Sequence, residues 1–131
     1  MTNDEIRVKI AKLRGAAWWE IDCQAYLCNP MHAAMLPKGA KVVDSPSPGS
    51  KVYYRVSNWP VDIKAAEILL DELAENHFSV KLMRWDYSTE WMMIMHHRQG
   101  HGETIHDDEI KGDTKCLAIC HAFIQWKESQ K

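Results

Sequence analysis

The sequence lacks several features that would place it in a large functional class. No apolar stretch approaches the roughly 20 residues that a membrane-spanning helix needs, and residues 1–15 mix charges without the apolar core of a signal peptide. There is no Gly-rich phosphate-binding loop, no nucleotide-binding fingerprint and no internal repeat. These absences predict no membrane association, and they favour a cytoplasmic protein.

The chain also lacks a strong excess of either charge. Its 16 Lys and Arg residues against 18 Asp and Glu residues leave a formal net charge of −2. Because the basic residues form no run, the chain offers no long-range attraction for a polyanion, which counts against nucleic-acid binding. With 131 residues, 46% of them hydrophobic, it has the size and composition of a single globular domain.

Cysteine, tryptophan and methionine are the residue types that stand out. Without a signal peptide, the four cysteines are expected to be free thiols or metal ligands rather than disulfides. Six Trp and seven Met are a high load for this length, and some of them must lie outside one compact core. We therefore predict an exposed apolar surface or a subunit interface, and so a homodimer or higher oligomer.

The first helix has clear boundaries in the sequence. Thr2 and Glu5 form a capping-box pair, and Ile6 and Ile10 give the helix an apolar face. Gly15 is a natural stop. A short strand is predicted over 16–22.

Residues 23–52 are the least regular part of the chain. Prolines and glycines interrupt every period, and the DSPSPGS segment at 44–50 is typical of a loop. Segments of this length without regular structure are often functional. A second short strand is predicted over 51–59.

The second half reads as one folding unit. A helix capped by Asp62 is followed by a strand over 78–85, a connection of hairpin length and a strand over 90–97. The latter strand is apolar on both faces, which predicts cover on both sides. A polar loop, with room for a short strand at its centre, leads to a last helix capped by Asp113 or Thr114. The sequence thus predicts one α+β domain over 1–131, with helices packed on a small antiparallel sheet, in the order α-β-(long loop)-α-β-β-α and with a loop insertion at 23–52.

Several packing motifs stand out along the chain, namely Gly15 to Trp18, Trp59-Pro60, Asp62 to Leu73, Phe78-Ser79-Val80, Trp91 and Leu117-Ala118-Ile119-Cys120. In these motifs the chain resembles a family of small phage and prophage proteins with a phage ABA sandwich domain. The resemblance covers about two thirds of the chain and misses residues 23–52. It implies a bacteriophage or prophage origin, hence a bacterial cytoplasm, and helices packed on a small sheet. It implies no catalytic residue.

One hypothesis for metal binding involves the histidines near the end of the strand at 90–97. The candidate ligands there are His96, His97, His101, His106, Asp107, Asp108 and Glu109. Zinc and nickel sites need two to four such ligands at close range. However, no fixed spacing of the H-E-x-x-H kind is present, and loops of this composition are usually solvated.

A second metal hypothesis involves the cysteines. Cys116 and Cys120 lie one helical turn apart, and Cys23 and Cys28 would complete a four-thiolate site if the long loop folded back. The spacings differ from the usual C-x2-C knuckles. Burial of Cys116 and Cys120 as inert core residues is the favoured interpretation, so the sequence predicts no cofactor.

Catalytic chemistry has little support in the sequence. Nothing in the order of the residues selects a nucleophile and base pair among the cysteines and histidines. The acidic pairs at 71–72 and 107–109 are expected to be solvated. A metal-dependent or thiol enzyme using the 96–106 region or the cysteines therefore stays an alternative, and a nucleic-acid-binding regulator is another.

Binding is the function that the sequence favours. Aromatic and Arg side chains, which anchor partners at interfaces or stack on bases, gather beside the expected strand ends. They are Tyr53, Tyr54, Arg55, Trp59, Arg84, Trp85 and Tyr87. The competing interpretation is that Trp59 and Trp85 only cap the ends of the core. The leading hypothesis is a phage accessory protein that binds a host protein or a small nucleotide, as proteins that counter host defence do.

Overall fold

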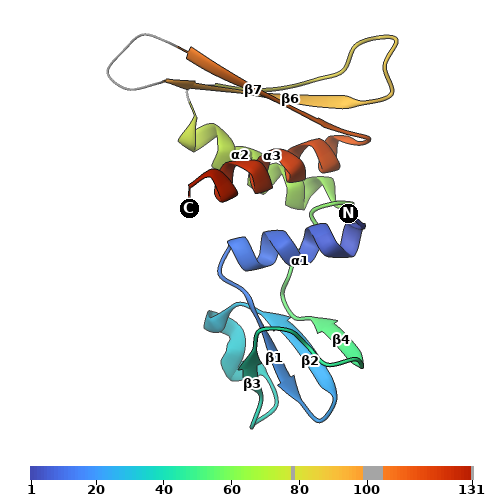
Figure 1. Ribbon diagram of the computed structural model, residues 1–131, viewed down its shortest axis with the longest axis vertical. Helices are drawn as coiled ribbons and strands as arrows, with labels where there is room; N and C mark the ends of the chain where they lie inside the picture. Colours follow the sequence, from blue (N-terminus) through green and yellow to red (C-terminus); the bar gives the residue numbers. More distant parts are fainter. Residues whose placement is uncertain (78, 99–104, 131) are drawn as a thin grey trace. The chain divides into compact units, whose positions relative to one another are not determined.

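The chain forms two compact units, which are described here one at a time (Figure 1). The computed structural model describes the backbone of residues 1–77, 79–98 and 105–130, and the side chains of these residues apart from 97, 98 and 105–108. Unit 1 is Met1–Ser57 and unit 2 is Asn58–Lys131. The sequence predicted one domain instead, because no linker-like composition marks the boundary before the Trp59-Pro60 turn.

Unit 1 consists of one helix and a four-stranded sheet. Its elements are α1 (Asn3–Leu13), β1 (Ala17–Ile21), β2 (Gln24–Cys28), the 3-10 helix η1 (Pro30–Met35), β3 (Lys41–Val43) and β4 (Ser50–Tyr53). The strand order is β3-β1-β2-β4. The pairs β1/β2 and β1/β3 are antiparallel, whereas β2 and β4 run parallel.

The start of α1 is the one that the sequence predicted. The Thr2 hydroxyl accepts a hydrogen bond from the Glu5 amide at 3.2 Å, which satisfies one of the free amides of the first turn. Ile6 and Ile10 are buried and supply the apolar stripe with which the helix packs on β2. The core of unit 1 therefore lies between α1 and one face of the sheet.

The predicted loop at 23–52 contains regular structure. Strands β2, β3 and β4 and the helix η1 all fall within it or at its end. The hairpin between β1 and β2 turns on Asp22 and Cys23, with φ values of 48° and 62°. Two positive φ values suit the twist of a two-residue hairpin. The Asn-Gly or Asp-Gly pair that usually indicates such a turn is absent, and the strands are short. For these reasons the strands could not be recognised from the sequence pattern.

Unit 2 has two helices and a three-stranded antiparallel sheet. Its elements are α2 (Ile63–Asn76), β5 (Ser79–Met83), β6 (Trp91–Arg98), β7 (Ile105–Gly112) and α3 (Lys115–Ser129). Asp62 caps α2 and Thr114 caps α3, as the sequence predicted. The sequence allowed only a short central strand in the polar loop after β6, but β7 pairs with β6 along its whole length.

The sheet of unit 2 has the order β5-β6-β7, and both helices pack on the same face of it (Figure 1). Met93, Met95 and Ile110 point to that face and are buried. Alternate residues of a strand point to opposite faces, so Met92 and Ile94 point away from the helices, and both are partly exposed. The sequence predicted that both faces of this strand are covered. In the described part of unit 2, the helices cover only one of them.

The α+β fold class is confirmed, since both units combine helices with a sheet. The antiparallel sheet predicted for the second half is present, although unit 1 adds a mixed sheet of its own. Within the described residues, no helix is long and apolar enough to cross a membrane.

Candidate binding pocket in unit 1

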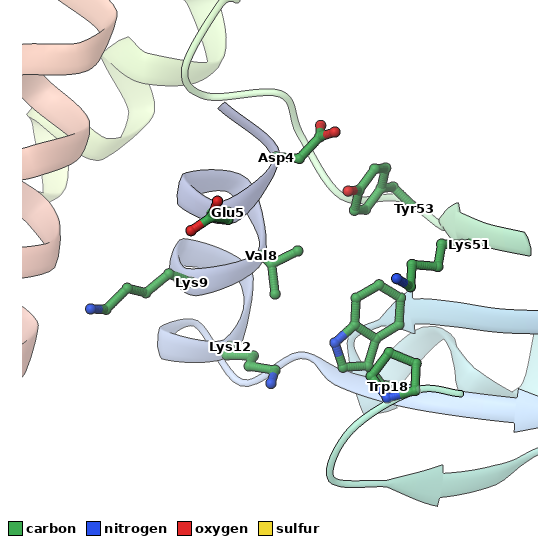
Figure 2. A pocket seen from close by; sticks show the side chains of 9 residues that line it. Asp4, Glu5, Val8, Lys9, Lys12, Trp18, Lys51 and Tyr53 are labelled. Atoms are coloured by element: carbon green, nitrogen blue, oxygen red, sulfur yellow. The ribbon is translucent and has the colours of Figure 1, made fainter. Parts of the chain in front are cut away.

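A pocket of about 480 Å³ opens between α1 and the sheet of unit 1 (Figure 2). The residues that line it are Asp4, Glu5, Val8, Lys9, Lys12, Trp18, Pro46, Lys51 and Tyr53. Its volume lies within the usual range of about 300–1,000 Å³ for sites that hold small molecules. Every lining residue belongs to unit 1, so the geometry of this site is set inside one compact body.

One wall is a second stripe along α1. Asp4, Val8 and Lys12 follow one another at intervals of four residues and therefore share one side of the helix. The apolar stripe through Ile6 and Ile10 lies on a different side and is buried. Along the pocket stripe, the side chains change from acidic near the helix start to basic near its end.

The opposite wall comes from the sheet. Trp18 of β1 and Tyr53 of β4 stand in the same cross-strand row, on either side of Leu27. Leu27 is fully buried and Trp18 is 4% exposed, so both are fixed by packing. The ring centroids of Trp18 and Tyr53 are 6.4 Å apart, with an angle of 46° between the planes. Lys51 is two residues before Tyr53 and so lies on the same face of β4.

The Arg7 guanidinium packs on the ring of Tyr53. Its guanidinium carbon lies 4.0 Å from the centre of the Tyr53 ring, a close cation–π contact. The same guanidinium donates hydrogen bonds to the carbonyl oxygens of Ser57 at 3.0 Å and Val56 at 2.5 Å. Partial burial lowers the pKa of Arg7 from its ordinary value, and burial raises the pKa of the Tyr53 hydroxyl, with Asp4 adding to the rise. The Tyr53 hydroxyl therefore stays protonated and can donate a hydrogen bond at neutral pH.

The charge around this pocket differs from that of the whole chain. Unit 1 contains eight Lys and Arg residues against five Asp and Glu residues, whereas unit 2 contains eight against thirteen. Three of the basic residues of unit 1 are in the pocket lining, where they outnumber the two carboxylates. The pocket thus combines an apolar part with a lysine on each wall, Lys12 on α1 and Lys51 on β4, a pairing that suits a planar ligand with a negative group.

Comparisons with models of protein families, with curated proteins and with solved structures found no match for this chain.

The structure divides the predicted binding residues among three places. Tyr54 and Arg55 follow β4 in unit 1, and the Arg55 guanidinium lies 5.9 Å from the Tyr54 ring. Neither lines the pocket, whereas their neighbour Tyr53 does. Trp59 is 7% exposed and belongs to the core of unit 2. Its burial agrees with the alternative interpretation, in which this side chain caps the core.

The remaining three predicted residues lie near one end of the sheet in unit 2. Trp85 and Tyr87 are 51% and 88% exposed, and their rings are nearly parallel, with centroids 6.4 Å apart. Both line a smaller hollow of about 280 Å³ that also includes Trp91. The Arg84 guanidinium lies 5.2 Å from the centre of the Trp91 ring. Arg84, Trp85 and Tyr87 thus lie close together, and their role in binding stays a prediction.

No metal site is found among the described residues. They contain no group of three or more His, Cys, Asp or Glu side chains arranged to hold an ion. The candidate ligands His97, His101 and His106 lie outside the described side chains. Cys116 and Cys120 are buried in α3, the placement that the sequence favoured.

Three of the four thiols are shielded from chemistry that needs a thiolate. Burial raises the pKa of Cys28, Cys116 and Cys120, that of Cys120 to about 12. A thiolate is the reactive form of cysteine, so these positions are poor nucleophiles near neutral pH. Cys23 is exposed in the β1–β2 turn.

We expect iodoacetamide to modify one thiol of the native protein rapidly at about pH 8, namely Cys23. With a pKa of about 12, Cys120 has roughly one thiolate in 10,000 molecules at that pH, and its burial blocks access as well. Intact-mass spectrometry should show one adduct before denaturation and, for the remaining buried cysteines, three more afterwards. Fast native modification of Cys120 would contradict the described packing of α3.

Sequence reasoning missed most of the pocket. The candidate binding residues chosen from the sequence did not include Lys12, Trp18 or Lys51. Lys51 and Tyr53 reach the pocket through the pairing of β4 with β2, and no local sequence pattern predicts that pairing. Tyr53, which belonged to the aromatic group in the sequence, was the only signal that pointed to this site.

Proposed function

We propose that this protein acts by binding, and that the pocket of unit 1 receives a small planar anion, with a mononucleotide as the best-fitting class. The observation that carries the proposal is the lining of the pocket: Val8, Trp18, Pro46 and Tyr53 on its apolar part, and Lys12 and Lys51 beside it (Figure 2). A base would fit against the apolar part, and its phosphate would meet the lysines.

The acidic end of the pocket favours a nucleotide over a simple aromatic acid. Asp4 and Glu5 line the pocket near the start of α1, and carboxylates accept hydrogen bonds from amino and hydroxyl groups. A nucleotide carries such donors on its base and ribose. Figure 2 shows Asp4 and Tyr53 next to each other at this end, with Lys12 and Trp18 farther along the pocket.

A biological setting for this activity comes from the resemblance to phage ABA sandwich proteins. A phage or prophage origin is part of the proposal, and a protein that holds a nucleotide without changing it would suit the neutralisation of a nucleotide used in host defence. The raised pKa values of the buried thiols weigh against thiol catalysis at Cys28, Cys116 and Cys120, and so support binding over that alternative.

Adenosine 5′-monophosphate is a suitable probe. Ligands of this size gain about 0.3 kcal/mol per non-hydrogen atom, which for about 23 atoms gives about 7 kcal/mol and a Kd on the order of 10 µM. Isothermal titration calorimetry of the full chain should detect this affinity, with adenosine and inorganic phosphate binding more weakly because each satisfies only one part of the pocket.

Charge reversal at Lys12 or Lys51 should weaken binding of the probe about tenfold or more. Each lysine offers a charge-assisted contact of about 1.5–3 kcal/mol to a phosphate, and a glutamate in its place repels the anion. Both side chains are exposed, so Lys12→Glu and Lys51→Glu should leave the fold intact, which circular dichroism would verify.

Lys38→Glu and Lys41→Glu are the matched controls. Both residues are exposed in unit 1 and neither lines the pocket, so they change the net charge of the unit by the same amount. If all four variants lost affinity equally, the effect would be one of overall charge and the pocket assignment would be wrong. Absence of binding by the wild type at millimolar probe would reject the nucleotide class.

A further inference from the structure

The sheet of unit 2 presents a face that its own helices leave uncovered. In the part of unit 2 that the structure describes, α2 and α3 both lie on the other face (Figure 1). The uncovered face, called here the outer face, carries the side chains that alternate with the buried Met93 and Met95. Its apolar members are Met83, Met92 and Ile94, all partly exposed. Apolar faces of this kind mark interaction sites.

Charge on the outer face follows a pattern across the strands. One cross-strand row runs from Lys81 on β5 through Ile94 on β6 to Glu109 on β7. Lys81 and Glu109 are exposed. The next row consists of Met83, Met92 and Lys111. The apolar central strand is thus flanked by Lys81 on the β5 side, and by Glu109 and Lys111 on the β7 side.

We infer that the outer face binds the outer face of a second copy of this chain, with the two-fold axis running between the sheets and parallel to β6. This rotation places Ile94 against Ile94 of the other copy and exchanges the two sides of the sheet. Lys81 of each copy then faces Glu109 of the other, which gives two ion pairs around an apolar centre. A two-fold axis perpendicular to the strands and through the Ile94 row would instead oppose Lys81 to Lys81 and Glu109 to Glu109. With Ile94 at the centre of the contact, the charges of its row therefore favour the first arrangement.

The spacing of a β-sheet suits this arrangement. Neighbouring strands lie about 4.8 Å apart and packed sheets about 10 Å apart. Lys81 and Glu109 therefore lie on opposite sides of Ile94, and a Lys and a Glu side chain can span the distance between two packed sheets. In a two-fold dimer the same patch serves both partners, and the alternation of charge supplies the required self-complementarity.

The size of the face sets the expected strength. Five residues along each of three strands cover about 17 by 14 Å, well below the roughly 800 Å² per partner of a standard interface. The exposed Trp85 and Tyr87 border the outer face, since they share a hollow with Met92 and Lys111, and they add area. We therefore expect a dimer that forms at micromolar or higher concentration. This dimer is independent of the ligand proposed for unit 1.

Charge reversal tests the inferred pairing. Sedimentation-velocity measurements on the full chain should show a concentration-dependent dimer for the wild type. Lys81→Glu and Glu109→Lys should each be monomeric at the same concentrations, because each opposes like charges across the axis. An equimolar mixture of the two variants should form a heterodimer, and the double variant should dimerise again, since both restore opposite charges at every contact.

Lys64→Glu and Glu67→Lys provide matched controls on α2, where both residues are exposed, and these variants should dimerise like the wild type. A wild type that stays monomeric at all concentrations would overturn the inference. It would mean that the outer face is covered from within the chain or by a different protein. Dimers that form equally well in both single charge variants would overturn it too, because the contact would then lie elsewhere. Failure of the mixture to form heterodimers would reject the two-fold axis proposed here.

Discussion

Replacing Gly112 with alanine should destabilise unit 2 by about 3 kcal/mol or more. Gly112 is buried where β7 passes the first turn of α3. A Cβ atom at this position would lie 2.3 Å from the Ala118 nitrogen and 2.7 Å from the Leu117 carbonyl carbon. Both are backbone atoms, so no side-chain rotation relieves the overlap and α3 must move away from the sheet. Overpacking commonly costs about 1–3 kcal/mol, and a backbone collision belongs at the upper end or beyond it.

Urea unfolding followed by circular dichroism would measure this loss, and faster hydrogen exchange in β7 and α3 would locate it. For a unit of this size, 1 kcal/mol corresponds to roughly 4–8 °C in Tm. Gln125→Ala, at an exposed position of α3, should change stability by less than about 0.5 kcal/mol. A Gly112→Ala protein as stable as the wild type would show that β7 and α3 do not approach as closely as described.

Leu27→Ala should cost unit 1 about 2–5 kcal/mol, the usual range for a buried leucine. Leu27 is fully buried, and in its cross-strand row it stands between Trp18 and Tyr53. Its carbonyl oxygen also accepts a hydrogen bond from the Tyr54 amide at 3.0 Å. Loss of the side chain leaves a cavity under α1 and removes the spacer between the two aromatic residues of the pocket.

The effect of Leu27→Ala should appear as faster hydrogen exchange in β1 and β2 and as weaker binding of adenosine 5′-monophosphate. Val42→Ala is a suitable control, because Val42 lies in the same sheet but is 55% exposed. If the two variants behaved alike, Leu27 would not be the centre of the core. A stable Leu27→Ala protein with unchanged affinity would show that the pocket does not depend on the packing of Leu27.

The helices were the elements that the sequence predicted best. Thr2, Asp62 and Thr114 each accept a hydrogen bond from an amide in the first turn of the helix that they cap. Such signals are local, since a cap and the apolar stripe behind it lie within a few residues of each other. The α+β class followed from these helices and from the alternating strand residues of β5.

Strands in the first half were harder to predict because the information that fixes them is distributed. β3 is three residues long, too short for alternation to show. β4 pairs with β2, a partner that residues 29–49 separate from it in the sequence. The turn at Asp22 and Cys23 has the geometry of an Asn-Gly hairpin without its usual residues.

The candidate pocket depended on the same missing information. An aromatic residue beside a strand end can be recognised in the sequence, and Tyr53 was recognised in this way. Its partners Lys12 and Trp18 belong to other elements, and only the fold shows that they meet. In unit 2, by contrast, Trp85 and Tyr87 are two residues apart, and their grouping could be predicted from the sequence alone.

The parallel pairing of β4 with β2 also determines the order in which unit 1 assembles. The β1–β2 hairpin closes over a two-residue turn, a step that takes about 1–10 µs in hairpins. For β4 to pair with β2, the intervening segment must first lose conformational entropy as its ends come together, before any contact forms. We therefore expect Lys51 and Tyr53 to reach the pocket last during folding and to leave it first during unfolding. A ligand that contacts both α1 and β4 would stabilise the state in which β4 is paired. Occupancy of the pocket should therefore slow the opening of β4 more than the opening of the hairpin.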